Sequence, residues 1–215
     1  MRRVLLAVLC CLASVAAVAG AATPPKTIMV LGDSLSAAHN IPIEAGWVHR
    51  LQARLDALQP PRRLVNASIS GETTQSGRSR LPSLLQQYQP ALVILELGAN
   101  DGLRGLPLAQ IRSNLDAMIA ACTAAGVKVL LLGIELPVNY GPRYRDGLRA
   151  IYADLARKHD TGLVPFLLDG VALKPELMQA DGMHPTAAGE PRVAANVWQA
   201  LAPMLQPPAA TAPDN

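Results

Sequence analysis

The sequence predicts one α/β domain of three layers, in which helices cover both faces of a mainly parallel sheet of about five strands. Strand-like and helix-like patterns alternate along the chain, which is the order that produces parallel strands joined by crossover helices. Several of the strand patterns are continuously apolar, as a sheet buried on both faces requires. The length of 215 residues provides one full hydrophobic core and is short for two domains.

The strands are expected where short apolar runs end at turn-forming residues. The five runs are 27–31, 63–67, 91–97, 127–132 and a short one at 162–165. Ligands of parallel α/β sheets bind at the carboxyl ends of the strands. The residues that directly follow these runs are therefore the first candidates for a functional site.

The helices are expected where apolar residues recur at helical spacing. They cover 44–58, 73–87, 108–125, 144–158 and 187–205. Pro82 is expected to break the second of these helices, and Gly126 is placed to cap the third. Pro191 fits the last helix only if it lies in the first turn, where its missing N–H breaks no hydrogen bond.

The first 21 residues are typical of a cleavable signal peptide. Arg2 and Arg3 precede an apolar stretch over 4–18, and a small-residue site follows that ends at Ala21. The apolar stretch is shorter than the roughly 20 residues of a membrane-spanning helix, which disfavours an uncleaved anchor. We therefore expect a periplasmic or secreted protein.

Cleavage after Ala21 would leave a domain over 22–206, although Ala19 or Ala22 could also precede the cut. A Pro/Ala-rich tail over 207–215 is expected to be disordered. Cys122 would then be the only cysteine, and its place on the apolar side of a helix favours a buried small hydrophobe over a reactive thiol.

The charge of the chain gives little reason to expect a macromolecular partner. The formal net charge is only +3, and no cluster of Lys and Arg stands out beyond the N-terminal pair. Nucleic acid and anionic membrane surfaces are therefore not expected as partners. No predicted helix has an additional apolar face that a second subunit would have to cover. We therefore expect a monomer that acts on a small-molecule substrate.

A candidate nucleophile follows the first strand. Ser34 stands in Gly32-Asp33-Ser34, where a glycine turn at a strand end would present its hydroxyl to a cleft. The tripeptide alone is a weak signal, since most copies are ordinary turns. A serine also requires a base to activate it.

Four histidines are available, and one has a suitable neighbour. His184 comes three residues after Asp181, so that the carboxylate can fold back onto Nδ1 and leave Nε2 free as a base. A helix-capping turn with a surface histidine fits the same residues. His39 lies in a loop near Ser34 and could line the cleft, but it has no carboxylate spaced to orient it. His49 and His159 are expected to be solvated.

Two further strand ends carry candidate oxyanion donors. Gly71 follows the second strand and could bring its N–H close to a ligand, and Asn100 follows the third and could direct its side-chain amide into the same cleft. Ordinary turns rich in Gly and Asn explain both segments equally well. Asp33 and Asp101 are expected to brace their loops through hydrogen bonds to backbone N–H groups.

The order of these blocks is more specific than any one of them. Gly-Asp-Ser, then Gly, then Gly-x-Asn-Asp and finally Asp-x-x-His resembles the four-block signature of the SGNH (GDSL) hydrolases, over residues 26–205. Longer segments resemble the periplasmic thioesterase I/lysophospholipase/arylesterase branch of that superfamily: 66–73, 97–105, 136–141 and 173–179. Ala99 is a departure, because relatives often carry Gly at that position.

The resemblance implies a flavodoxin-like fold and the hydrolysis of esters and thioesters without a metal or an organic cofactor. It implies that Ser34 is the nucleophile, that His184 is the base and then the acid, and that Asp181 orients His184. The backbone N–H groups of Ser34 and Gly71, with the Asn100 side chain, would bind the oxyanion. A segment over 134–143 is placed to flank the acyl site or to form an ordinary surface loop. A carbohydrate acetylesterase and an inactive lipid-binding homologue are the alternative functions.

Overall fold

The computed structural model describes residues 26–206 and contains one five-stranded sheet with the strand order β2-β1-β3-β4-β5. All neighbouring strands are parallel. The strands are β1 (Thr27–Gly32), β2 (Arg63–Asn66), β3 (Leu92–Glu96), β4 (Lys128–Leu132) and β5 (Gly162–Val164). The predicted fold class and all five strands are confirmed. The expected signal peptide and C-terminal tail lie outside the described residues.

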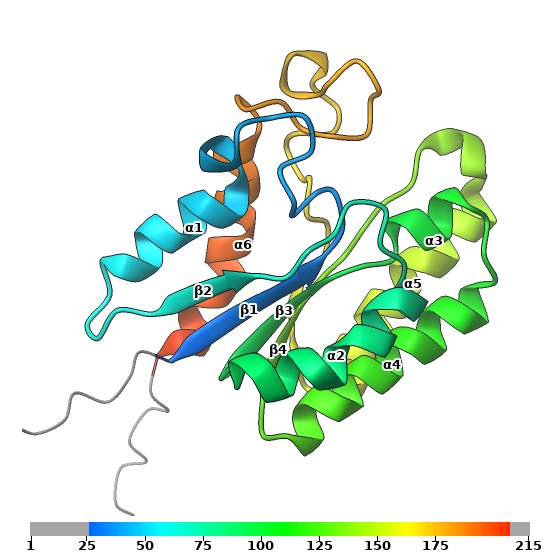
Figure 1. Cartoon of the computed structure of the whole chain (residues 1–215). Helices are drawn as coiled ribbons and strands as arrows, with labels where there is room; N and C mark the ends of the chain where they lie inside the picture. The colour runs from blue at the N-terminus through cyan, green and yellow to red at the C-terminus, as the bar shows by residue number, and fades with distance from the viewer. Residues whose placement is uncertain (1–25, 207–215) are drawn as a thin grey trace, which may run out of the picture.

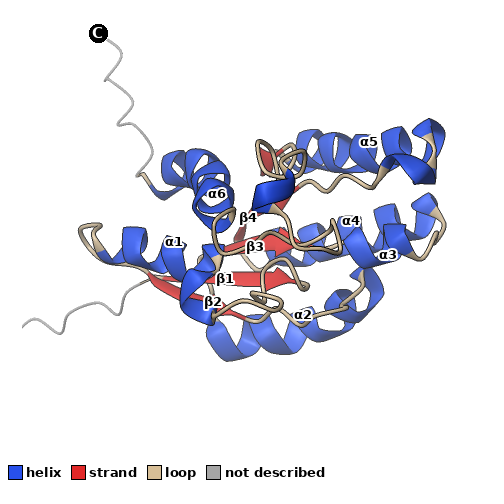
Figure 2. Cartoon of the chain, turned by 90° about the horizontal axis from the view of Figure 1, so that it is seen from above, coloured by secondary structure: helices blue, strands red, loops and turns tan. Residues whose placement is uncertain are grey.

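Helices cover both faces of the sheet (Figure 1). On one face α1 (Trp47–Asp56) packs beside α6 (Glu190–Leu205), and on the other α4 (Leu108–Ala124) lies between α2 (Thr74–Tyr88) and α5 (Pro142–His159). Figure 2 shows these two helical layers from above, with the strands between them. None of the helices in this described part is long and apolar enough to cross a membrane.

The strand order places a topological switch point at one end of the sheet. The chain leaves β1 toward β2 on one side, returns to β3 on the other side of β1, and then proceeds outward through β4 and β5. The carboxyl ends of β1 and β3 therefore form the switch point at which ligands of such sheets bind. The segments that carry Ser34 and Asn100 leave the sheet at this point.

The core explains why the central strands are continuously apolar. Residues 28–31 of β1 and 92–95 of β3 are at most 2% exposed, because helices cover them from both sides. Cys122 of α4 is 1% exposed within this core, and burial raises the pKa of its thiol to about 12. The expectation of a buried, unreactive cysteine is confirmed.

One predicted feature of the helices is wrong. Pro82 does not break α2, which continues from Thr74 to Tyr88. Leu81 and Leu84, on either side of the proline, are both buried against the core, and this packing holds the two halves in line despite the missing N–H.

The other helix ends are close to those predicted. Gly126 adopts φ +71°, its N–H donates to Thr123 and that of Val127 donates to Cys122, which together form a Schellman cap on α4. Pro191 lies in the first turn of α6, as expected. The sequence did not predict α3 (Ala99–Leu103), a single turn of helix directly after β3.

Candidate active site

Three side chains from distant parts of the sequence form a continuous hydrogen-bonded chain at the switch point. The Oγ of Ser34 lies 2.8 Å from Nε2 of His184, and Nδ1 of His184 lies 2.7 Å from Oδ2 of Asp181. Ser34 follows β1, whereas the other two belong to the loop between β5 and α6. In Figure 1 this loop, in yellow and orange, lies on the same side of the sheet as the blue loop after β1.

The loop geometry of Asp181 prepares its carboxylate for this contact. Oδ1 accepts hydrogen bonds from the backbone N–H of Met183 at 2.9 Å and of His184 at 3.1 Å, which leaves Oδ2 for the imidazole. Gly182 adopts φ +65°, a conformation that favours glycine, and so allows the chain to fold back. Partial burial acts to raise the pKa of Asp181, but these hydrogen bonds and the neighbouring His184 outweigh it and lower the pKa to about 2.

Gln179 fixes the histidine loop against the serine loop. Its Nε2 donates to the carbonyl of His39 at 2.9 Å and to that of Pro185 at 2.8 Å, and its backbone N–H donates to the carbonyl of His184 at 2.8 Å. His39 is in turn bound to the turn that carries Ser34, because its N–H donates to the carbonyl of Ser34. One partly buried amide therefore sets the distance between the two loops.

A buried carboxyl group supports the turn that carries Ser34. Oε2 of Glu96, the last residue of β3, accepts hydrogen bonds from the Asp33 N–H at 3.2 Å and from the Ser36 hydroxyl at 2.7 Å. A Cβ on Gly32 would lie 2.7 Å from the same oxygen, so only glycine fits beside the carboxyl group. Asp33 accepts the Leu35 N–H, which confirms its predicted role as a loop brace.

Asp33 and Glu96 form a buried acidic pair at the turn that carries Ser34. Burial raises the pKa of Asp33 to about 6 and raises the pKa of Glu96 well above its ordinary range. The neighbouring Asp33 carboxylate further raises the pKa of Glu96, whereas hydrogen bonds from the Leu35 N–H and the Asn100 amide favour the ionised form of Asp33. Glu96 is therefore the neutral member of the pair.

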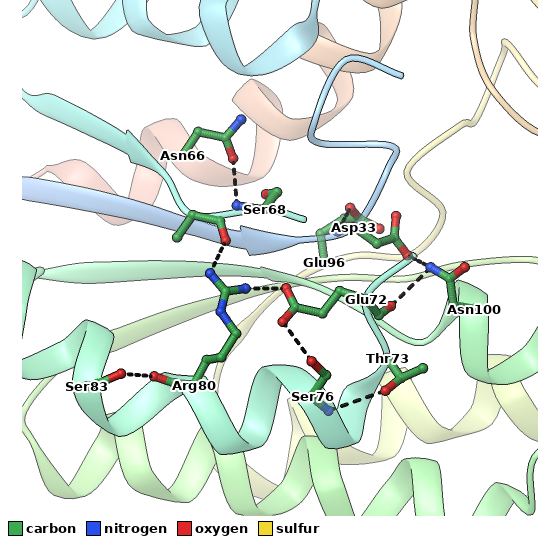
Figure 3. Close-up of polar contacts among 11 residues, drawn as sticks. Asp33, Asn66, Ser68, Glu72, Thr73, Ser76, Arg80, Ser83, Glu96 and Asn100 are labelled. Atoms are coloured by element: carbon green, nitrogen blue, oxygen red, sulfur yellow. Dashed lines mark hydrogen bonds and ion pairs between the residues drawn. The ribbon is translucent and has the colours of Figure 1, made fainter. Parts of the chain in front are cut away.

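Asn100 joins the turn that carries Ser34 (the serine turn) to the segment around Gly71 (the glycine turn). Its Nδ2 donates to Oδ2 of Asp33 and to the carbonyl of Glu72, both at 3.0 Å (Figure 3). These acceptors stand directly beside Ser34 and Gly71 in the sequence, so the three segments expected to supply oxyanion donors do meet. Within residues 26–206, neither the Ser34 nor the Gly71 backbone N–H donates to a protein group, whereas both hydrogens of the Asn100 amide have protein acceptors.

An ion pair that the sequence did not reveal fixes the glycine turn to α2. The Glu72 side chain is 1% exposed and pairs with Arg80 of α2, which also donates to the carbonyl of Ala67 at 2.9 Å (Figure 3). The Ser76 hydroxyl donates to the other oxygen of Glu72. These contacts bind both ends of the segment around Gly71 to α2.

A second buried network anchors α3 and hence Asn100. Asp101 accepts hydrogen bonds from the N–H of Thr74 at 2.8 Å and from its hydroxyl at 2.5 Å, which confirms the predicted loop-bracing role of Asp101. Asn114 of α4 donates to the same hydroxyl at 3.1 Å. All three side chains are at most 5% exposed, so α3 is fixed to both α2 and α4.

The remaining histidines occupy different surroundings. The ring of His39 lies against that of His184, with the centroids 4.3 Å apart, so His39 lines the site as the sequence allowed. His49 is exposed, as expected. His159 is not the solvated side chain that was expected, because it is mostly buried and its Nε2 contacts Asp116.

The segment over 134–143 combines buried and exposed parts. Leu136 is 4% exposed and packs near Gly102 of α3, whereas Val138 is 79% exposed. A shallow cavity of about 330 Å³ lies beside Tyr140 and Tyr144. α5 begins at Pro142, two residues earlier than predicted, because proline fits the first turn of a helix.

Sequence reasoning missed several residues that support the site. Glu96 carried a usable signal. It is the one acidic residue in an otherwise apolar strand, and it stands at the carboxyl end of that strand, where the site lies. Glu72 and Gln179 carried none, since both stand in loop segments, where a charged or amide side chain is ordinary.

The comparisons with known proteins agree with this geometry. Residues 30–191 match the model of the GDSL-like lipase/acylhydrolase family. The chain is 51% identical to esterase TesA of Pseudomonas aeruginosa, over 84% of this chain and 90% of the relative. It is 43% identical to thioesterase 1/protease 1/lysophospholipase L1 of Escherichia coli K12, over 86% and 87%. The crystal structure of the psychrotrophic esterase EstA from Pseudoalteromonas sp., inhibited by monoethylphosphonate, has 40% identity and a TM-score of 0.79, over 84% of this chain and 98% of that one. The chain belongs to the GDSL-like lipase/acylhydrolase family and is an ester and thioester hydrolase of the SGNH type, in the thioesterase I branch that its sequence motifs indicated.

Proposed function

We propose that Ser34, His184 and Asp181 are the catalytic triad of this hydrolase. The observation that carries the proposal is the hydrogen bond of 2.8 Å between the Ser34 hydroxyl and Nε2 of His184. The ionised Asp181 fixes the Nδ1–H tautomer of His184, which leaves Nε2 as the proton acceptor that a serine nucleophile requires.

The reaction proceeds through an acyl-enzyme. Ser34 Oγ attacks the substrate carbonyl while its proton moves to Nε2 of His184. The tetrahedral oxyanion collapses, the alkoxide or thiolate leaves with that proton, and an acyl ester remains on Ser34. Water then loses a proton to His184, attacks the acyl ester and releases the carboxylic acid with the regenerated serine.

The oxyanion is bound by the backbone N–H groups of Ser34 and Gly71 and by the Asn100 amide. The two backbone groups have no acceptor within the described residues, which leaves them available to a ligand. The amide must exchange or share one of its two present hydrogen bonds, and the bond to Asp33 is the one beside the nucleophile. A hydrogen bond to the negatively charged oxyanion is stronger than one to the neutral carbonyl, so this exchange is favoured as the oxyanion forms.

The site and its setting favour small acyl substrates outside the cytoplasm. We propose that the 1–21 segment directs export and is removed, and that the remaining chain acts as a monomer without nucleic acid or a stable membrane anchor. The lysophospholipase and thioesterase names of the relatives point to acyl chains of lipid origin as the substrates to test first.

The test is the turnover of Ser34→Ala on p-nitrophenyl esters and acyl-CoA thioesters of increasing chain length. Removal of the nucleophile should lower kcat by at least about 10³ while the fold is retained. Ser79→Ala is the matched control, because it removes an exposed hydroxyl of α2 that donates to the Gln75 carbonyl of its own helix, and it should keep most of the activity. Near-normal turnover by Ser34→Ala would refute the assignment. Turnover confined to acetylated sugars would favour the carbohydrate acetylesterase instead.

A further inference from the structure

The side chain of His39 lies in the active site but has no role in the proposed mechanism. Its imidazole ring lies 4.3 Å from that of His184, with the ring planes 36° apart. Within residues 26–206, the side-chain partner of this ring is the exposed amide of Asn40, 3.0 Å from Nε2. A second imidazole is therefore held against the catalytic base without a structural partner in the core.

Together with the triad carboxylate, the two histidines form a set of metal-binding side chains. One ligand atom each from His39, His184 and Asp181 lies within 4.8 Å of the other two. Two imidazoles and one carboxylate are a donor set that binds Zn²⁺ with an open fourth position. In a tetrahedral site the donor atoms are about 3.3 Å apart, so a modest rotation of side chains brings these three into range.

The backbone beneath these side chains is already fixed. The Gln179 amide donates to the carbonyls of both His39 and Pro185, and its N–H donates to the carbonyl of His184. The two histidine loops therefore keep their spacing when no ion is bound, which reduces the ordering cost of binding one. All three donor side chains are at least partly exposed, so an ion reaches them from solvent.

We propose that His39, His184 and Asp181 form an inhibitory Zn²⁺ site that inactivates the hydrolase when it is occupied. The proposal rests on the catalytic role proposed above for His184 and Asp181. It adds a regulatory ligand and a residue, His39, that would have no part in catalysis.

Inhibition follows from whichever nitrogen of His184 binds the ion. If Nε2 binds Zn²⁺, the lone pair that accepts the Ser34 proton is occupied. If Nδ1 binds Zn²⁺, the hydrogen bond to Asp181 is lost and the remaining proton moves to Nε2, which can no longer act as a base. A neutral imidazole has one lone pair, so no arrangement lets His184 bind the ion and accept the serine proton.

The first test compares inhibition by Zn²⁺ in three proteins, each relative to its own metal-free rate. Wild type and His49→Ala, which removes an exposed histidine of α1, should lose activity at the same Zn²⁺ concentration and recover it when EDTA is added. His39→Gln, which keeps a polar side chain of similar length, should require at least about tenfold more Zn²⁺. Mg²⁺, which prefers oxygen ligands, should not inhibit any of them.

The second test separates this proposal from the catalytic one. Titration calorimetry of Ser34→Ala with Zn²⁺ should detect one bound ion per chain, because this variant keeps all three ligands, and His39→Gln in the same background should abolish that binding. Equal Zn²⁺ sensitivity of wild type and His39→Gln, or absence of binding to Ser34→Ala, would overturn the zinc site. Full activity of a Ser34→Ala variant that binds Zn²⁺ would instead overturn the proposed nucleophile.

Discussion

The Ser36 hydroxyl donates a hydrogen bond of 2.7 Å to Glu96, and this contact fixes the turn that carries Ser34 to the end of the neighbouring strand β3. The same oxygen of Glu96 accepts the Asp33 N–H, while Oε1 has no hydrogen-bond partner among the described residues. Because burial keeps Glu96 neutral, its side chain supports the turn that carries Ser34 through hydrogen bonds and not through a charge.

If Glu96 is neutral and only accepts hydrogen bonds, replacing its carboxyl group by an amide should be tolerated. Glu96→Gln keeps an acceptor for both donors and should change the free energy of unfolding by less than about 1 kcal/mol, with kcat/KM close to that of wild type. Glu96→Ala leaves the Asp33 N–H and the Ser36 hydroxyl without a partner and should cost about 2–4 kcal/mol, through the unpaired donors and the cavity. Urea denaturation and ester hydrolysis measure both. A Gln variant as damaged as the Ala variant would show that Glu96 acts as a charged group.

Gly98 should be intolerant of any side chain. It adopts φ +123°, and a Cβ there would lie 2.3 Å from the Tyr152 hydroxyl, which donates to the carbonyl of Leu97. Gly98→Ala should lower the free energy of unfolding by about 3 kcal/mol or more and reduce kcat, because it displaces the α3 turn that holds Asn100.

The matched control for this substitution is Gly105→Ala. Gly105 also has a positive φ, +65°, but a Cβ there meets no atom within 4 Å. Only the backbone penalty of about 1–2 kcal/mol is expected, with little effect on kcat. Equal losses in the two variants would mean that the contact with Tyr152 is unimportant.

Asp181→Asn should separate the orientation of His184 from the fold. An amide that donates to Nδ1 stabilises the wrong imidazole tautomer, so kcat should fall by about 10³–10⁴ with the melting temperature nearly unchanged. Asp169→Asn, at a carboxylate that is 71% exposed, is the control and should be fully active. A loss of less than tenfold in Asp181→Asn would contradict the orienting role.

Glu190 should make the stability depend on pH. Its Oε2 accepts the Trp47 N–H at 2.7 Å and so joins the start of α6 to the start of α1. Burial raises the pKa of Glu190 to about 7 from an ordinary 4.5, against the opposing effects of that hydrogen bond and of Arg50. The folded protein therefore binds this proton more tightly than the unfolded chain. The resulting stability is complete below about pH 4.5 and is lost as the pH rises through about 7.

The measurement is urea denaturation of wild type and Glu190→Gln at pH 5 and pH 8. Relative to the variant, wild type should lose on the order of 2 kcal/mol between the two conditions. A difference between the two proteins that stays constant with pH would show that Glu190 does not titrate in this range.

The sequence predicted those parts of the structure that depend on local pattern. The apolar runs gave all five strands, since a doubly covered parallel sheet leaves few other ways to bury them. The motif order singled out Ser34, His184 and Asp181 as candidates, and the structure brings their side chains together.

What the sequence could not show depends on contacts between distant residues. Pro82 was expected to break α2, but buried leucines on both sides keep the helix continuous. The neutral state of Glu96 requires knowledge of its burial, and the pairing of His159 with Asp116 joins two different helices. The approach of His39 to His184 depends on Gln179, whose bonds join two loops.

The central claim is that Ser34 is the nucleophile, and covalent labelling tests it most directly. A serine-directed phosphonate should modify wild type with one equivalent, and peptide mass spectrometry should place the adduct on Ser34. The Asp181→Asn variant should react much more slowly, and Ser34→Ala should not react. An adduct on any other residue, or labelling of Ser34→Ala at the wild-type rate, would contradict the account.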